Sequence, residues 1–137
     1  MQKTLIAILT GATVMGFAGT ANATQCITKY LTGVWVGTET GNTDDAYCVV
    51  QFKSNGWVIQ ASCFDRDTLK SEGTWDGRFT TDKACNVSGN FDFLPTKGKK
   101  VDIEFKGTLN PNTGVMTGTM KSKGQAAVDY TLVEQWN

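Results

Sequence analysis

The 137-residue chain contains no histidine and only two prolines, and neither sign of charge is in excess, with 13 Lys and Arg against 13 Asp and Glu. Without imidazole, His-based triads, His general bases and His metal ligands are excluded. A Gly-x-Ser-x-Gly nucleophile elbow is also missing. The balanced charge argues against binding to nucleic acid. We therefore expect a protein without enzymatic activity, metal or cofactor.

Long apolar runs are absent too, except near the start of the chain. A cationic start is followed by an apolar stretch over residues 5–18 and by Ala21-Asn22-Ala23, a small-x-small cleavage signal. A membrane-spanning helix needs about 20 mostly apolar residues, and this stretch is shorter. The pattern predicts a signal peptide over residues 1–23 and a single β-barrel domain over 24–137. We expect an exported protein, secreted or periplasmic, that is not embedded in a membrane.

The chain has four cysteines, an even number, and all of them follow the predicted signal peptide: Cys26, Cys48, Cys63 and Cys85. They are separated by 22, 15 and 22 residues, so no Cys-x-x-Cys pair is available for a zinc site. In an oxidising compartment such a set predicts two disulfides.

Glycine, asparagine, aspartate and threonine interrupt every helical period at intervals of about ten residues, a spacing typical of antiparallel hairpins. Between them, apolar and polar residues alternate. Cys48, Val50 and Phe52 share one face, and a second set of Trp57, Ile59, Ala61 and Cys63 is predicted to do the same. We expect eight strands, near residues 33–40, 47–53, 57–64, 71–79, 84–93, 100–109, 115–121 and 126–135.

Because each strand has one apolar face and the turns are short, we expect an all-β fold, an eight-stranded antiparallel up-and-down barrel. The interior of such a barrel holds packed side chains or one small ligand. A β-sandwich is the alternative. A two-residue Asn55-Gly56 turn would pair residues whose numbers sum to 111, which places Cys48 opposite Cys63. Counted along the ladder this is a hydrogen-bonded pair, with Cα atoms ~5.5 Å apart. The predicted disulfides are therefore Cys48–Cys63 and Cys26–Cys85.

Alternate connections of such a barrel emerge at the same end, and here they are charged. The acidic residues of this rim are Asp44, Asp45, Asp65 and Asp67, and its basic residues include Lys97 and Lys123. The acidic residues suit a calcium site or a carboxylate pair, or they are ordinary turn-forming residues. A rim with acidic residues on one side and basic residues on the other would orient a zwitterionic ligand or a protein partner. Alternatively, these charges only keep the protein soluble.

The aromatic residues fall into two groups. Trp35, Trp57 and Trp136 are expected at the end opposite the charged rim, where their rings would plug the barrel. A second set lies in mid-strand: Trp75, Phe91 and Tyr130. These three either line a cavity or fill the core. With a plugged far end, a ligand would enter at the charged rim, and the mid-strand rings would form the inner walls.

The segment Leu31-Thr32-Gly33-Val34-Trp35, with its Gly-x-Trp at the opening of the first strand, resembles the calycin group of small exported barrels, the lipocalins and avidins. This resemblance implies binding of a small ligand in the barrel mouth. The segments 47–52 and 62–63 are similar to bacterial periplasmic inhibitors of secreted metalloproteases, which implies a protein partner instead. Ligand binding is the leading hypothesis, and a protein-binding inhibitor or interaction module is the alternative.

Overall fold

The computed structural model describes residues 25–41 and 46–135. The predicted signal peptide, Asp44 and Trp136 lie outside the described residues. Within the described ranges, no helix has the length and apolar character needed to cross a membrane.

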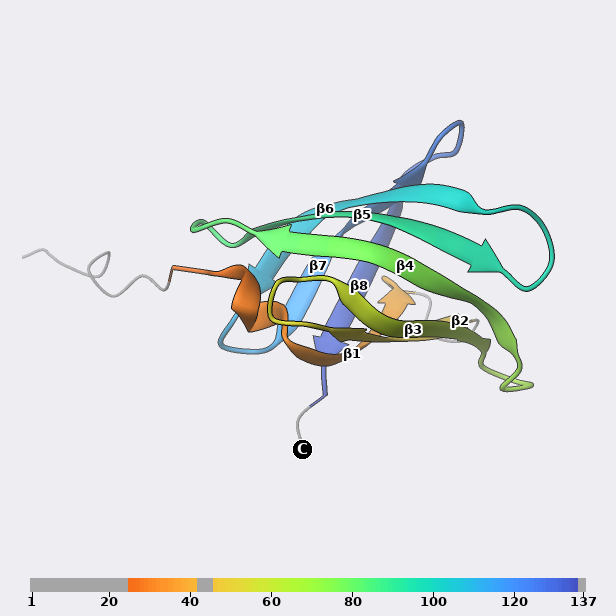
Figure 1. Cartoon of the computed structure of the whole chain (residues 1–137), viewed down its shortest axis with the longest axis horizontal. Helices are drawn as coiled ribbons and strands as arrows, with labels where there is room; N and C mark the ends of the chain where they lie inside the picture. Colours follow the sequence, from red (N-terminus) through yellow and green to blue (C-terminus); the bar gives the residue numbers. More distant parts are fainter. Residues whose placement is uncertain (1–24, 42–45, 136–137) are drawn as a thin grey trace, which may run out of the picture.

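The described chain forms a closed antiparallel barrel in which each strand pairs with the next and the last pairs with the first (Figure 1). After a 3-10 helix, η3 (Thr28–Leu31), come β1 (Gly33–Glu39), β2 (Ala46–Phe52), β3 (Val58–Asp65), β4 (Ser71–Thr81), β5 (Asn86–Pro95), β6 (Val101–Asn110), β7 (Val115–Ser122) and β8 (Val128–Glu134). The prediction of an eight-stranded up-and-down barrel is confirmed, and the sandwich is not adopted. Each strand therefore has a paired neighbour on both sides, although β3 and β4 pair over a short segment only.

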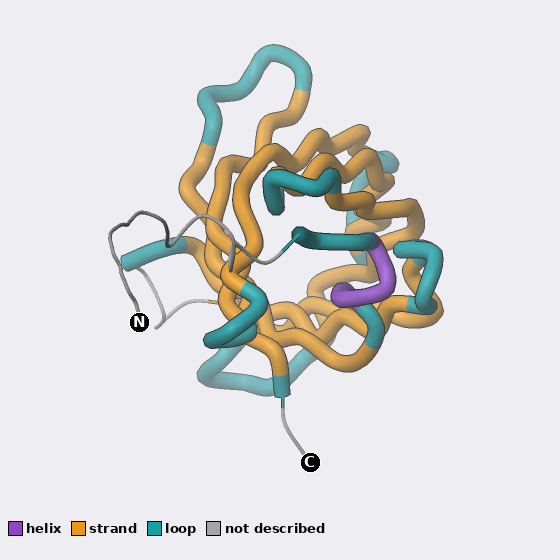
Figure 2. The backbone as a smooth tube through the Cα atoms, turned by 90° about the vertical axis from the view of Figure 1, so that its left-hand side faces the viewer, coloured by secondary structure: helices purple, strands orange, loops and turns teal. Residues whose placement is uncertain are grey.

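The two ends of the barrel differ. β1 starts beside η3, so the β3–β4, β5–β6 and β7–β8 connections emerge at the far end, which we call the mouth. Figure 2 views the barrel from the η3 end and shows η3 and the segment before it lying across the opening. The N-terminal segment therefore covers the η3 end.

Large apolar side chains fill the half of the barrel next to η3. Trp35 is fully buried, and its indole N–H donates a hydrogen bond to the Leu31 carbonyl oxygen over 2.8 Å. The Phe79 ring lies 5.0 Å from the ring of Phe52 and 5.3 Å from that of Phe105. Side chains rather than open space therefore fill the described interior of the η3 half.

The hairpin of β2 and β3 departs from its predicted geometry. The Lys53 N–H donates to the Trp57 carbonyl over 2.8 Å, which leaves a loop of three residues instead of two. Further along, Phe52 pairs with Val58 but Gln51 pairs with Gln60, so Ile59 is an extra residue in a β-bulge.

The bulge reverses which side chains face the core at the start of β3. Val58 packs against the core, whereas Ile59 is 53% exposed and Trp57 is 46% exposed. The prediction that Trp57 plugs the barrel, and that Trp57 and Ile59 face inward, is therefore wrong. Beyond the bulge the sum of paired residue numbers returns to 111, and Ala61 and Cys63 are buried as expected.

Both predicted disulfides are present, Cys48–Cys63 and Cys26–Cys85. The first joins directly opposite residues of β2 and β3. Its Cα atoms are 3.9 Å apart, closer to the ~4.5 Å of a non-hydrogen-bonded pair than to the expected hydrogen-bonded spacing. The second joins the segment before η3 to the β4–β5 turn, and so holds the cover of the η3 end in place.

Candidate functional site: the barrel mouth

A cavity of about 260 Å³ lies inside the mouth half of the barrel. Its walls are mostly apolar and come from all eight strands: Glu39, Ala46, Cys48, Cys63, Glu72, Trp75, Phe91, Phe93, Ile103, Met120 and Tyr130. The packed η3 half lies beneath it and forms its floor. Its volume is close to the lower limit of ~300 Å³ for small-molecule pockets.

The structure brings the three predicted wall residues together in this cavity. The rings of Trp75 and Phe91 are stacked with centroids 4.3 Å apart, and the Tyr130 ring lies 6.3 Å from that of Trp75. Trp75 and Phe91 are 6% and 4% exposed, so each presents only a small part of its ring to the cavity. Rigid aromatic walls of this kind give a ligand a large contact area at little cost in side-chain entropy.

Tyr130 carries the polar atom nearest the aromatic wall. Its side chain is largely buried, and this burial raises the pKa of the phenol well above its usual range, so it stays neutral. No residue of 25–41 or 46–135 hydrogen-bonds its hydroxyl. The ring lies against β1 because residue 37 is glycine: a Cβ on Gly37 would lie 2.6 Å from the tyrosine ring. The hydroxyl is therefore available to a ligand.

Two glutamates, Glu39 and Glu72, add negative charge to the walls, and sequence reasoning missed both. Glu39 ends β1 two residues after Gly37 on the inner face, and it is paired with Tyr130. Continuing the alternation of β1 would have found it. Glu72 is the extra residue of a second bulge, because Cys63 pairs with Gly73 and Phe64 with Ser71. No simple sequence signal marks that bulge, which re-aims a side chain that alternation assigns to the outside.

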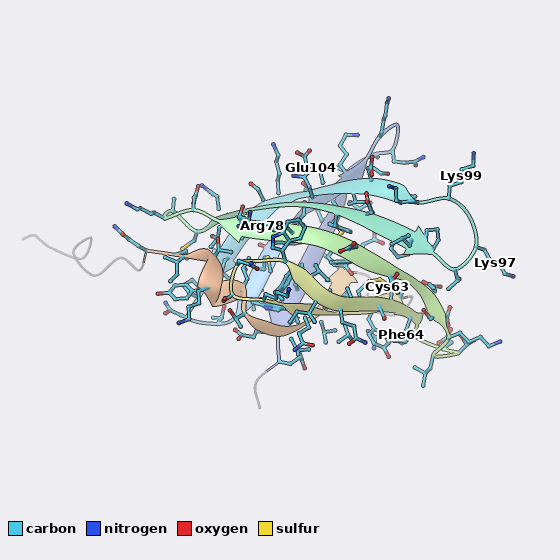
Figure 3. All side chains as sticks on the ribbon, viewed as in Figure 1. Cys63, Phe64, Arg78, Lys97, Lys99 and Glu104 are labelled. Atoms are coloured by element: carbon cyan, nitrogen blue, oxygen red, sulfur yellow. A yellow bond between two sulfur atoms is a disulfide. The ribbon has the colours of Figure 1, made fainter. Side chains whose placement is uncertain are left out.

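The predicted rim residues that the structure describes, Asp65, Asp67, Lys97 and Lys123, lie outside the cavity lining. Asp65 caps its own turn: Oδ1 accepts the N–H groups of Asp67 and Thr68 over 3.0 and 2.9 Å. The Thr68 N–H is the main reason that the pKa of Asp65 is lowered. Lys97 lies at the tip of the β5–β6 connection, and Figure 3 shows it pointing away from the barrel. Lys123, in the β7–β8 connection, borders a groove on the outer surface.

That outer groove, about 690 Å³, is larger than the mouth cavity, but half of the residues that line it are charged. Asp76, Asp92 and Asp102 sit directly opposite one another on neighbouring strands. Hydrogen bonding to Asp92, and repulsion by its charge, raise the pKa of Asp102. Nowhere in the described part of the chain do three potential ligands gather to hold a metal ion. The mouth cavity, more enclosed and aromatic, is the better candidate site.

Fold and site together define a class: a closed eight-stranded antiparallel barrel with one packed end, one hollow end and two disulfides. No protein family, curated protein or solved structure matches the chain.

Proposed function

We propose that this chain is an exported, non-catalytic barrel that binds a small molecule in its mouth. The observation that carries the proposal is the contrast between the packed η3 half and the hollow, aromatic mouth half. A monomeric barrel gains stability by filling its interior, so a hollow lined by aromatic side chains is expected to serve a ligand. The two disulfides are consistent with an oxidising compartment, in line with export.

The resemblance of residues 31–35 to the lipocalin and avidin group supports the same function. In this proposal the ligand enters between the β3–β4, β5–β6 and β7–β8 connections and stops at the packed floor. Its apolar part contacts Trp75 and Phe91, and the Tyr130 hydroxyl supplies one hydrogen bond. Burial of apolar area contributes ~25 cal/mol per Å² before the costs of association.

The experiment is an NMR titration of the mature protein with small aromatic probes, beginning with 2-phenylethanol and its amine analogue. We expect shifts of the Trp75 indole and the Met120 methyl group that are lost in Tyr130→Ala but kept in Tyr30→Ala. Tyr30 is a matched control because it is 41% exposed in η3, at the other end of the barrel. Shifts confined to Trp57 and the outer groove, or none with any probe, would overturn the proposal.

One observation favours a second function, binding of a protein. The β5–β6 connection projects at the mouth end (Figure 1), and it carries Lys97, Lys99 and Lys100. A projecting basic loop suits an inhibitor or interaction module that docks on an acidic surface. Native mass spectrometry of the protein purified from its own source separates the two functions: a retained small mass supports the mouth site, and a retained polypeptide supports the loop.

A further inference from the structure

We infer that the ligand of the mouth cavity is an organic cation: an ammonium compound with a compact apolar body. This inference rests on the proposed function, since it specifies the chemistry of the same site. It follows from the charges of the cavity walls, the aromatic rings that border the cavity and the position of Lys121.

The charged groups in the cavity walls are of one sign. Glu39 and Glu72 line the cavity, and none of the residues that line it is lysine or arginine. The ion pairs formed within residues 25–41 and 46–135 involve neither glutamate. Both glutamates are solvent-exposed at the opening of the cavity. Their negative charge therefore attracts a cation to the opening and repels an anion, most strongly at low ionic strength.

The rings of the walls favour the same sign. Aromatic rings carry negative charge on their faces, and a cation within about 6 Å of a ring centroid is attracted to it. Trp75, Phe93 and Tyr130 all border the cavity. Because the Tyr130 phenol is neutral and has no hydrogen-bond partner among the described residues, it can accept an ammonium N–H.

Lys121 lies close to the mouth cavity but does not line it. Lys121 borders an adjoining hollow of about 370 Å³ beside the β7–β8 hairpin. This hollow shares Glu39, Ile103, Met120 and Tyr130 with the mouth cavity. The ammonium group of Lys121 donates a hydrogen bond to the Gln125 carbonyl oxygen on that hairpin. This bond holds the lysine at the outer side of the adjoining hollow.

An inorganic cation does not fit the same walls. Most of the lining is carbon or sulfur, which cannot replace the hydration shell of a small ion. No three potential metal ligands come together in the part of the chain that is described. An organic ammonium ion suits both the apolar lining and the two glutamates. Its apolar body contacts the rings, and its charged end stays near the glutamates at the opening.

The test compares three probes of nearly equal size by NMR titration: 2-phenylethylammonium, 2-phenylethanol and 3-phenylpropionate. We expect the cation to bind roughly 10-fold more tightly than the alcohol and the anion to bind most weakly. Equal affinities, or tighter binding of the anion, at the same cavity residues would overturn the inference and leave the proposed function standing. Absence of binding by all three would overturn both.

Variants locate the source of the preference. Glu39→Gln and Glu72→Gln are each expected to weaken binding of the cation about 3-fold and to leave binding of the alcohol unchanged, and the double variant should bind the two equally. Asp67→Asn is the matched control, because it removes the same charge from the mouth end at a residue that does not line the cavity. An equal loss in Asp67→Asn would show that long-range charge, rather than the two glutamates, selects the ligand.

Discussion

At the scale of single residues, Gly56 holds the loop between β2 and β3 against the core. Its φ is +86°, and its carbonyl oxygen accepts the Phe79 N–H over 2.9 Å. A Cβ at this position would lie 1.7 Å from the Phe79 carbonyl oxygen, which is backbone and cannot move aside cheaply. The loop can therefore approach β4 only because it carries glycine here.

Gly56→Ala is expected to lower the free energy of unfolding by at least about 2 kcal/mol, because steric overlap adds to the strain of a left-handed backbone. Urea denaturation of the two proteins measures the difference. Gly41→Ala is the control: its φ is +80°, but nothing lies within 4 Å of the added Cβ. That variant should lose only about 1 kcal/mol, from backbone strain alone. Equal losses would show that the Phe79 contact is unimportant.

Asp102 faces Asp92 across the β5–β6 ladder, and like charges in that position are destabilising. The hydrogen bond and the repulsion from Asp92 raise the pKa of Asp102. An acid whose pKa is raised by folding contributes stability below that pKa and loses it as the pH rises through it. We therefore expect Asp102→Asn to be more stable than the wild type at pH 7.

The gain from Asp102→Asn should shrink as the pH is lowered through the raised pKa, where the wild-type carboxyl is itself protonated. Thermal unfolding at pH 7 and at about pH 3 tests this. Glu104→Gln provides the comparison, because Glu104 pairs with Lys121 across the β6–β7 ladder and lies 3.9 Å from the Lys106 ammonium. It should give no gain at pH 7. A gain from both variants would indicate general charge repulsion rather than the Asp pair.

At the scale of elements, the β2–β3 hairpin tolerates an extra residue because the bulge absorbs it. Ile59 and Gln60 both lie on the outside, between the core-facing Val58 and Ala61. Deleting Ile59 would restore strict alternation without moving Cys63 from its place opposite Cys48. We expect this deletion variant to fold with both disulfides, at a cost below about 2 kcal/mol.

Deletion of Ser62 is the matched comparison, because it removes an outward residue on the other side of Ala61. It shifts the register between Ala61 and Cys63, so that one of the two turns away from the core. We expect little soluble protein and loss of the Cys48–Cys63 link in a non-reducing peptide map. If the Ile59 deletion behaved in the same way, the bulge would be required for folding.

Alternation predicted the strands wherever it was uninterrupted, and it failed at the bulges. The inner faces of β5 and β6 follow the sequence pattern, so Val87, Phe91 and Phe105 are buried as expected. At Ile59 and Glu72 an extra residue reverses the alternation of inward and outward side chains. The extra residue can be recognised only from the register with the partner strand, which the sequence does not show. Consequently the aromatic walls of the site were predictable, whereas the contribution of Glu72 was not.

At the scale of the whole molecule, the order of the strands determines which connections lie at the same end of the barrel. The volumes of the inward side chains determine which half of its interior is hollow. The number of strands and their antiparallel order followed from the spacing of turns, as did both disulfides. Whether the interior is full depends on how each ring meets the rings of other strands. The Phe79 ring of β4, for example, lies 5.0 Å from that of Phe52 in β2 and 5.3 Å from that of Phe105 in β6. Contacts between strands that are not consecutive are not visible in a linear pattern.

The two disulfides are expected to affect the two ends of the barrel differently. Cys26–Cys85 spans 59 residues and Cys48–Cys63 spans 15. In the chain-entropy account, loops of these lengths contribute about 4 and about 3 kcal/mol, because the longer crosslink restricts the unfolded chain more. Replacing each pair by serine and measuring urea denaturation should therefore show the larger loss for Cys26 and Cys85.

Removal of the two disulfides is expected to affect ligand binding in the reverse order, with the larger loss on removal of Cys48–Cys63. Cys48 and Cys63 line the mouth cavity, whereas Cys26 holds the cover of the packed end. At a temperature where both double-serine variants remain folded, replacing Cys48 and Cys63 should weaken binding of 2-phenylethylammonium. Replacing Cys26 and Cys85 should leave it within about 2-fold of the wild type. If the Cys26 and Cys85 variant lost binding while remaining folded, the two halves would not be independent, and the packed end would itself shape the mouth.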